Sequence, residues 1–293
     1  MTPQIEIQII VILVALSCAL SGVFLVLRGM SMMTDAIGHT VLLGIVLGFF
    51  ISGRLDSPIL FLGAGAFGIV TAYGVEVLSK TRLIKEDASI GLVFPFLFSI
   101  AIILITRFAG NVHLDTDSVL LGELAFAPLE RIQAFGMDIG PKSMVVMSII
   151  LIINIGYFML FYKELKLGTF DPQFAQAAGF STLFIHYSLM SIVSFTSVGA
   201  FDAVGAILVV AFMVGPPASA YLLTSRLLPM ILTSCGIGVI NSIIGYIVAI
   251  NLDISISGTI ASTTLVTFIV CFVISVYMKL RNRTQNIIIE SHN

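Results

Sequence analysis

The chain has 293 residues, of which 58% are hydrophobic and only 10% are charged, and its mean hydropathy is +1.11. A water-soluble domain of this length needs far more polar surface, so the composition excludes a soluble globular protein and indicates an integral membrane protein. The net charge of −2 also argues against nucleic-acid binding, which requires clustered Lys and Arg on a solvated face.

Apolar runs long enough to cross about 30 Å of hydrocarbon recur along the whole chain. The first run follows Thr2, Pro3 and Glu6 rather than positive charges, so we interpret it as a retained span and not as a cleaved signal peptide. The sequence predicts an all-α polytopic protein with a single transmembrane domain over residues 1–293. We expect nine spans, near residues 7–27, 31–52, 58–79, 88–106, 143–162, 181–200, 203–224, 228–250 and 258–278.

Nine spans place the two termini on opposite sides of the membrane. If the N-terminus is outside, ten Lys and Arg residues flank the spans on the cytoplasmic side and four on the outer side. Because positive charge is enriched on the cytoplasmic side, the count favours an N-out, C-in orientation. The mixed region 107–142 then lies outside as a loop with a short helix, and the loop 163–180 faces the cytoplasm.

The second expected span begins with an acid and an imidazole, Asp35 and His39. On a helix, residues four apart share one face with Cβ atoms about 5–6 Å apart, which allows both side chains to bind one divalent cation. A structural hydrogen bond that caps the helix start is the alternative. We favour the metal site, because an ionisable residue in a span costs about 2.5–3.5 kcal/mol and usually marks a pathway. Imidazole with carboxylate suits Mn²⁺, Fe²⁺ or Zn²⁺.

Further acids are expected on the outer side, where they would raise the local concentration of cations at an entrance. Glu123 has apolar neighbours on both sides, which predicts that it leans toward the protein interior. Asp202 is expected at the turn between two apolar helices, where helix capping explains it equally well. Solubility alone is the other explanation for the three remaining polar residues, which are His113, Asp115 and Asp117.

The cytoplasmic loop contains the signals of a short, well-delimited helix. Asp171 is placed to cap its start, Pro172 to occupy its first position and Gly179 to end it in the left-handed conformation. Such a helix is suited to docking a partner, although ordinary loop helices carry the same signals.

The segment VVAFMVGPPASAYLLT combines Gly215 with Pro216 and Pro217 in an apolar run. Each proline lacks an N–H and frees a carbonyl one turn earlier, so we expect a bend there. A moving hinge beside the pathway and static, kinked packing both account for it.

Small and polar residues within the spans predict close helix packing. Gly44 and Gly48 form a small-xxx-small face that would pack helices within or between subunits. Asn154 and Asn241 lie in the middle of spans, where we expect them to form hydrogen bonds between helices.

Five segments, in this order, resemble the membrane subunit of bacterial ABC importers for manganese, zinc or iron(II). They are LRGMSMMTDAIGHTVLLGIVLG with its Asp-x-x-x-His pattern, EDASIGLVF, LDTDSVLLGEL, KELKLGTFDPQFAQAAG and FDAVGAILVVAFMVGPPASAYLLTSRL. The resemblance extends from about residue 10 to residue 280. The segments GELAFAP and DIGPK are most similar in sequence to those of the manganese permeases of Gram-positive bacteria.

The resemblance implies a fold similar to the cobalamin and siderophore ABC permeases, and a multi-pass protein of the bacterial cell membrane. It implies that two copies of the permease form a homodimer that sits on cytosolic ABC ATPases. It also implies an extracellular metal-binding lipoprotein as a partner. In this family the Asp and His of the second helix are implicated in the metal path. The resemblance therefore implies the same role for Asp35 and His39. The family's ATPase-docking helix corresponds to Phe170, Asp171, Pro172, Gln173, Phe174, Ala175 and Gly179.

We therefore expect a transport permease, not an enzyme, that imports a divalent transition metal by alternating access and binds no permanent cofactor. Manganese is the expected metal, with zinc or iron(II) as alternatives. A proton-coupled secondary carrier would show internal inverted repeats, which the sequence does not contain. A membrane metalloprotease would need H-E-x-x-H, whereas Thr-Val-Leu-Leu follows His39.

Overall fold

A computed structural model describes residues 2–54, 57–108, 124, 127–134 and 137–290. Within them, nine helices are long and apolar enough to cross a membrane, as the sequence predicted. They are α1 (Pro3–Leu27), α2 (Met33–Ser52), α3 (Pro58–Lys80), α4 (Glu86–Phe108), α6 (Lys142–Leu160), α9 (Thr182–Val204), α10 (Ala206–Leu223), α11 (Leu227–Leu252) and α12 (Ile256–Glu290).

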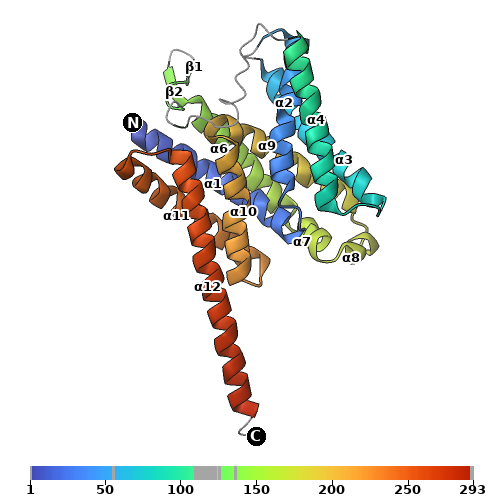
Figure 1. The fold of residues 1–293 in the computed structure, drawn as a ribbon, viewed down its shortest axis with the longest axis vertical. Coiled ribbons are helices and arrows are strands. Elements are labelled where there is room, and N and C mark those ends of the chain that lie inside the picture. The colour runs from blue at the N-terminus through green and yellow to red at the C-terminus, as the bar shows by residue number, and fades with distance from the viewer. Residues whose placement is uncertain (1, 55–56, 109–123, 125–126, 135–136, 291–293) are drawn as a thin grey trace.

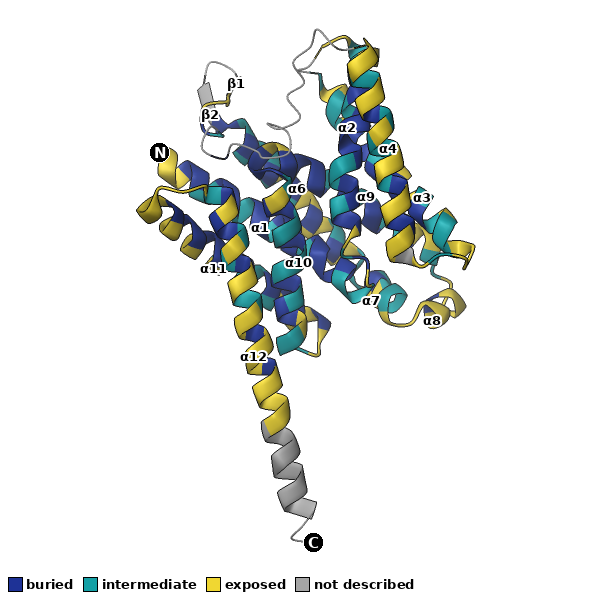
Figure 2. Ribbon diagram, in the orientation of Figure 1, coloured by how far each residue is buried: buried dark blue, intermediate teal, exposed yellow. Residues whose placement is uncertain are grey.

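Helix α1 lies at the centre of the bundle and packs against α6, α9, α10 and α11 (Figure 1). Helices α2, α3 and α4 form one side of the molecule, and α10, α11 and α12 form the other. The buried residues concentrate in the central helices, whereas α12 is largely exposed (Figure 2). Its exposed side chains, such as Leu265, Phe272 and Val273, are apolar, which is expected of a surface that faces lipid.

The region 107–142, expected to be a loop with a short helix, contains a β-hairpin in its described part, whereas the rest of the chain has the all-α fold that was predicted. Strands β1 (Arg131–Ala134) and β2 (Met137–Pro141) pair antiparallel, with an irregularity in the register after Ile132. Strands this short carry too few alternating residues to be distinguished in sequence from a loop. The hairpin lies at the end of the bundle opposite to the short helices α7 (Tyr162–Phe170) and α8 (Pro172–Ala177) (Figure 1).

An ion pair ties this hairpin to the first helix. The Arg131 guanidinium contacts both carboxylate oxygens of Glu6, with Nη1 lying 3.1 Å from Oε2. Glu6 lies in the first turn of α1 and is almost fully buried, so the pair satisfies a carboxylate that would otherwise be costly. Helix α1 begins at Pro3, four residues before the expected start, and so includes Glu6.

The small residues of α2 pack against α3 within the same chain, which decides between the two alternatives left open by the sequence. A Cβ atom on Gly44 would overlap the carbonyl group of Gly63, and a Cβ on Gly63 would lie 2.6 Å from the carbonyl oxygen of Gly44. The two backbones are therefore in direct contact. One turn before Gly44, the hydroxyls of Thr40 and Thr71 form a hydrogen bond of 2.7 Å between the same helices.

The mid-span asparagines form hydrogen bonds between helices, as predicted. Asn154 of α6 donates to the Thr196 hydroxyl of α9 at 3.0 Å. Asn241 of α11 accepts a hydrogen bond of 2.7 Å from Thr267 of α12. Each bond removes a polar group from contact with lipid.

Both prolines lie inside α10, which is helical on either side of them. The Ser219 hydroxyl donates to the Gly215 carbonyl at 2.8 Å, and Gly215 itself leaves room for the methyl group of Thr264 in α12. The carbonyl of Met213, which Pro217 leaves without an intrahelical donor, lies against Gly22 of α1. The segment is thus closely packed on two sides.

We predict that Gly44→Ala destabilises the protein, because the added methyl group must displace a backbone segment of α3. Overpacking of this kind costs about 1–3 kcal/mol. Gly156→Ala is the matched control, since its Cβ meets no atom within 4 Å. Thermal unfolding in detergent should show a lower midpoint for Gly44→Ala alone; equal midpoints for the two variants would contradict the close contact of α2 and α3.

Candidate functional site

The first two turns of α2 are held by neighbouring helices, and the face that carries Asp35 and His39 stays accessible. The Thr34 hydroxyl donates to a methionine sulfur of α10 at 3.3 Å. Gly38 leaves room for the ring of Phe201 in α9, since a Cβ there would lie 2.6 Å from the ring. By contrast, the Asp35 and His39 side chains are 48% and 32% exposed. The packing fixes the helix and leaves these two groups free to bind a ligand.

The two side chains lie close together without forming a hydrogen bond. His39 Nε2 is 3.6 Å from Asp35 Oδ1, which is beyond hydrogen-bonding distance. The N-cap residue of α2 is Met32, and no side chain caps this end, so the capping alternative is not realised. Two donors that each lie about 2.1 Å from one ion are at most about 4.2 Å apart, so the observed spacing fits a shared metal.

Two phenylalanines of α4 orient the imidazole. The His39 ring stacks on Phe94 with a centroid distance of 5.4 Å and meets Phe98 edge-on at 5.6 Å. These contacts restrict the ring and shield one side of it from water. Among the residues that the structure describes, no third His, Cys, Asp or Glu joins the pair to make a group of three.

Of the other predicted metal ligands, only Asp202 lies in the described part of the chain, and it is not brought to this pair. Asp202 lies in the last turn of α9 and not in a turn between helices, because α9 continues to Val204 and the chain turns at Gly205, whose φ is +83°. Asp202 is exposed and interacts electrostatically with Lys142 and Glu130 near the hairpin. It caps no helix, since the N-cap of α10 is Gly205. Four predicted residues lie outside the described part of the chain: His113, Asp115, Asp117 and Glu123.

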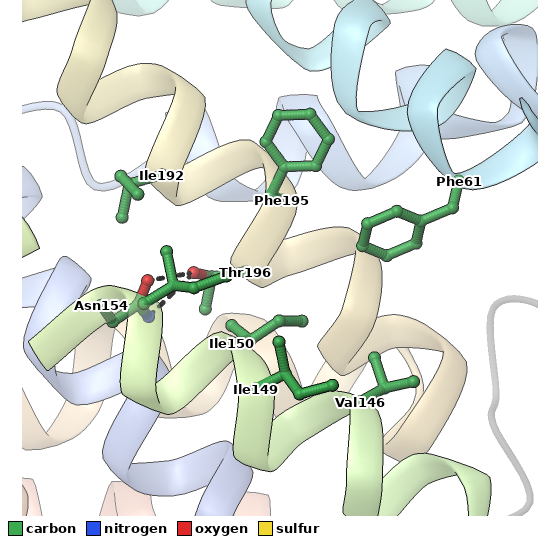
Figure 3. A pocket seen from close by; sticks show the side chains of 9 residues that line it. Phe61, Val146, Ile149, Ile150, Asn154, Ile192, Phe195 and Thr196 are labelled. Atoms are coloured by element: carbon green, nitrogen blue, oxygen red, sulfur yellow. Dashed lines mark hydrogen bonds between the residues drawn. The ribbon is translucent and has the colours of Figure 1, made fainter. Parts of the chain in front are cut away.

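An apolar hollow of about 260 Å³ lies between α6 and α9, with Phe61 of α3 at its edge (Figure 3). Its polar lining groups belong to Asn154 and Thr196, which are hydrogen-bonded to each other. With no ionisable lining residue, this hollow has no donor set for a metal ion.

A second cavity, of about 360 Å³, contains polar groups that the sequence analysis did not connect. Glu76 of α3 pairs with Lys80 at 2.7 Å and accepts a hydrogen bond from Tyr187 of α9. His186 Nε2 lies 3.9 Å from the same carboxylate. Only the spacing of Glu76 and Lys80, four residues apart on a helix, was visible in the sequence. The carboxylate is already neutralised by Lys80, so we do not assign it to the metal site.

The short helix in the loop 163–180 has the ends that the sequence predicted. Asp171 Oδ1 accepts a hydrogen bond of 2.9 Å from the backbone N–H of Phe174, and Pro172 is the first residue of α8. Gly179 adopts a φ of +87° just beyond the helix. The preceding helix α7 was not predicted. Phe170 and Phe174 are 58% and 57% exposed, which leaves two large aromatic side chains uncovered outside the spans.

Comparison with known proteins shows which family shares these features. The family described as the ABC 3 transport family matches residues 5–277. The chain is 47% identical over 245 residues to the manganese transport system membrane protein MntD of Bacillus subtilis, covering 84% of this chain and 83% of that protein. It is 51% identical over 211 residues to the zinc transport system membrane protein TroD of Treponema pallidum, covering 72% of this chain and 57% of that protein.

Solved structures agree with the family match. PsaBC from Streptococcus pneumoniae, solved in complex with Fab, superimposes with a TM-score of 0.78 at 31% sequence identity, covering 96% of each chain. A putative metal-chelate type ABC transporter in an inward-facing conformation has a TM-score of 0.62 over 94% of this chain and 85% of that chain, and at 16% identity it supports the fold alone.

We predict that Asp171→Ala loosens α8, because the Phe174 N–H loses its acceptor. Loss of an N-cap costs about 1 kcal/mol. Hydrogen exchange of the purified chain in detergent should become faster at the amides of residues 174–177. Asp171→Asn, which keeps an acceptor oxygen, should exchange like the unchanged chain; equally fast exchange in both variants would refute the capping role.

Proposed function

Because the chain belongs to the ABC 3 transport family, we propose that it is the membrane subunit of an ATP-driven importer for a divalent transition metal, with manganese preferred over zinc or iron(II). The chain is not itself an enzyme, and ATP hydrolysis belongs to a separate subunit. It is a multi-pass protein of the cell membrane. The observation that carries the proposed metal path is the Asp35–His39 pair, whose donor atoms lie 3.6 Å apart on an accessible face of a transmembrane helix.

The chemistry of the pair supports a transition metal as the transported ion. A carboxylate oxygen and an imidazole nitrogen together suit Mn²⁺, Fe²⁺ and Zn²⁺ better than the hard ions Ca²⁺ and Mg²⁺ or the soft ion Cu⁺. Two donors from one chain are too few to hold such an ion alone. The remaining coordination positions of the ion would be filled by water or by groups beyond the described part of one chain. The partial exposure of Asp35 is consistent with a second permease copy facing it.

Transport is proposed to run inward by alternating access. An extracellular metal-binding protein delivers the ion, and the outer acids Glu123 and Asp202 raise its local concentration at the entrance. The ion then reaches Asp35 and His39 and is released inward when ATP binding closes the partner subunits. The homodimer and the roles of these four residues are part of the proposal.

Helix α8 is the proposed contact with the ATPase. Its six residues are held by the Asp171 cap at one end and by Gly179 at the other, so the helix presents a defined surface. Phe170 and Phe174 lie outside the membrane-spanning helices, where exposed aromatic side chains are costly unless a partner covers them. Gln173 is exposed on the same short helix, whereas Ala175, also predicted for this contact, is fully buried and offers no surface to a partner.

We expect Asp35→Asn to lower manganese uptake more than about tenfold, since loss of even an outer partner of a metal ligand costs about 10–100-fold. The amide keeps the size of the side chain and removes its charge. Uptake of radioactive manganese, zinc and iron should be measured in cells that carry each variant, with permease–ATPase assembly checked in parallel.

Asp253→Asn is the matched control for this experiment. Asp253 is an exposed residue with a φ of +55° at the end of α11, a conformation that asparagine tolerates. Undiminished uptake in Asp35→Asn would remove this residue from the metal path. Uptake of zinc or iron in preference to manganese would show that manganese is not the preferred metal.

We predict that Phe174→Ala weakens the association with the ATPase, because buried aromatic anchors at interfaces contribute about 2 kcal/mol or more. The α8 cap uses the backbone of this residue and should survive. Co-purification of the ATPase with the tagged permease measures the effect. Phe272→Ala, an equally exposed phenylalanine on the lipid-facing helix α12, should leave co-purification unchanged; a loss no greater than in this control would exclude Phe174 as an anchor.

A further inference from the structure

Arg28 joins two parts of the molecule that are far apart in sequence. It lies in the connection between α1 and α2, at the C-cap of α1, and its Nε donates a hydrogen bond of 3.2 Å to the Thr169 hydroxyl near the end of α7. The two partners are 141 positions apart in the sequence, and the chain between them includes α2, α3, α4 and α6. This hydrogen bond therefore connects the start of α2 directly to the cytoplasmic helices.

The connection on the α2 side is short and internally bonded. The backbone N–H of Met30 donates to Leu25 at 2.9 Å, and that of Met33 donates to Met30 at 3.0 Å. Helix α2 begins at Met33, so Asp35 lies in its first turn. Arg28 and Asp35 are therefore separated only by one hydrogen-bonded turn and the first residues of α2.

The connection on the α7 side is equally direct. Thr169 lies two residues before Asp171, the residue that caps α8. The Asp171 N–H donates to the Leu167 carbonyl at 2.8 Å, so the turn of α7 that carries Thr169 continues up to the cap. Leu165 is fully buried and anchors α7 to the bundle. Thr169 is thus joined to the cap of α8 by a continuous hydrogen-bonded turn.

The guanidinium is turned into the protein and not toward the headgroups. Burial lowers the pKa of Arg28, although the nearby Tyr157 hydroxyl raises it, and an arginine keeps its charge in either case. The guanidinium also lies close enough to His186 for an electrostatic interaction. Its Nη2 is buried and has no hydrogen-bond partner among the described residues. An unpaired buried donor costs free energy, which favours a second arrangement in which it is paired.

We propose that the Arg28–Thr169 hydrogen bond couples movement of α8 to the position of Asp35, and that Arg28 is a positioning residue of the transport cycle. The inference rests on the proposed function, in which α8 contacts the ATPase and Asp35 contacts the metal. Coupling between distant sites requires an element that can adopt two arrangements, and a guanidinium with one hydrogen bond formed and one donor unpaired is suited to that role.

A simpler role for Arg28 predicts different behaviour. A cation at the C-terminus of α1 interacts favourably with the helix dipole and satisfies the preference for positive charge on the cytoplasmic side. Any cation suffices for that role, so neither Arg28→Lys nor a change of Thr169 would alter transport. The proposed coupling requires the Nε of arginine and the hydroxyl of residue 169.

The test uses the complete importer, with its ATPase and its metal-binding protein, reconstituted in vesicles. Manganese uptake and ATP hydrolysis are measured in the same preparation for Thr169→Val, Thr169→Ser, Arg28→Lys and the control Arg226→Ala, an exposed cation at the start of α11. We expect Thr169→Val and Arg28→Lys to lower the manganese imported per ATP hydrolysed about tenfold, within the usual range for coupling between sites. Thr169→Ser and Arg226→Ala should match the unchanged importer.

The outcomes separate this inference from the proposed function. If the unchanged importer transports manganese and both Thr169→Val and Arg28→Lys match it, the coupling role is overturned and the proposed function stands. If the Thr169→Val permease no longer assembles with the ATPase, Thr169 only shapes the docking helix, and the coupling role is overturned as well. If the unchanged importer takes up no metal, the proposed function itself fails.

Discussion

Ionisable side chains are costly in hydrocarbon, and two acids of the spans are paired with cations. Glu6 is buried against Arg131, and Glu76 is neutralised by Lys80. Arg28 is turned inward at the end of α1. Against this background Asp35 stands out, because it lies in a transmembrane helix with no cation beside it among the described residues and remains half exposed. In the proposed function, a metal ion is the partner of this carboxylate.

The precision of that site depends on backbone packing. Helix α2 touches α3 through glycine, α9 through Gly38 and α10 through the Thr34 hydroxyl, so three neighbours fix its rotation and depth. The phenylalanines of α4 then fix the His39 ring. Few of these contacts involve charge, so close packing positions the site. The groups that could bind a ligand are the two side chains of Asp35 and His39.

The sequence predicted the features that follow from local pattern. Nine apolar runs became nine helices within the described residues, and Asp171, Pro172 and Gly179 delimit α8 as expected. The spacing of Asp35 and His39 correctly placed both on one face of α2, whereas their role as a metal site remains a proposal. Contacts between distant residues were not predictable: the Glu6–Arg131 pair, the Arg28–Thr169 bond and the β1–β2 hairpin each depend on how the chain folds back on itself. Asp202 was misplaced because α9 continues to Val204, about one turn beyond the expected end at residue 200.

The direct contact of the α2 and α3 backbones has a further consequence. With carbonyl groups meeting at Gly44 and Gly63 and no side chains between them, neither helix slides along the other without breaking the interface. The two helices therefore travel as one rigid body, whatever drives them. A spectroscopic label at Tyr73, which is exposed on α3, would report the motion of the helix that carries Asp35 from a position that leaves its chemistry undisturbed.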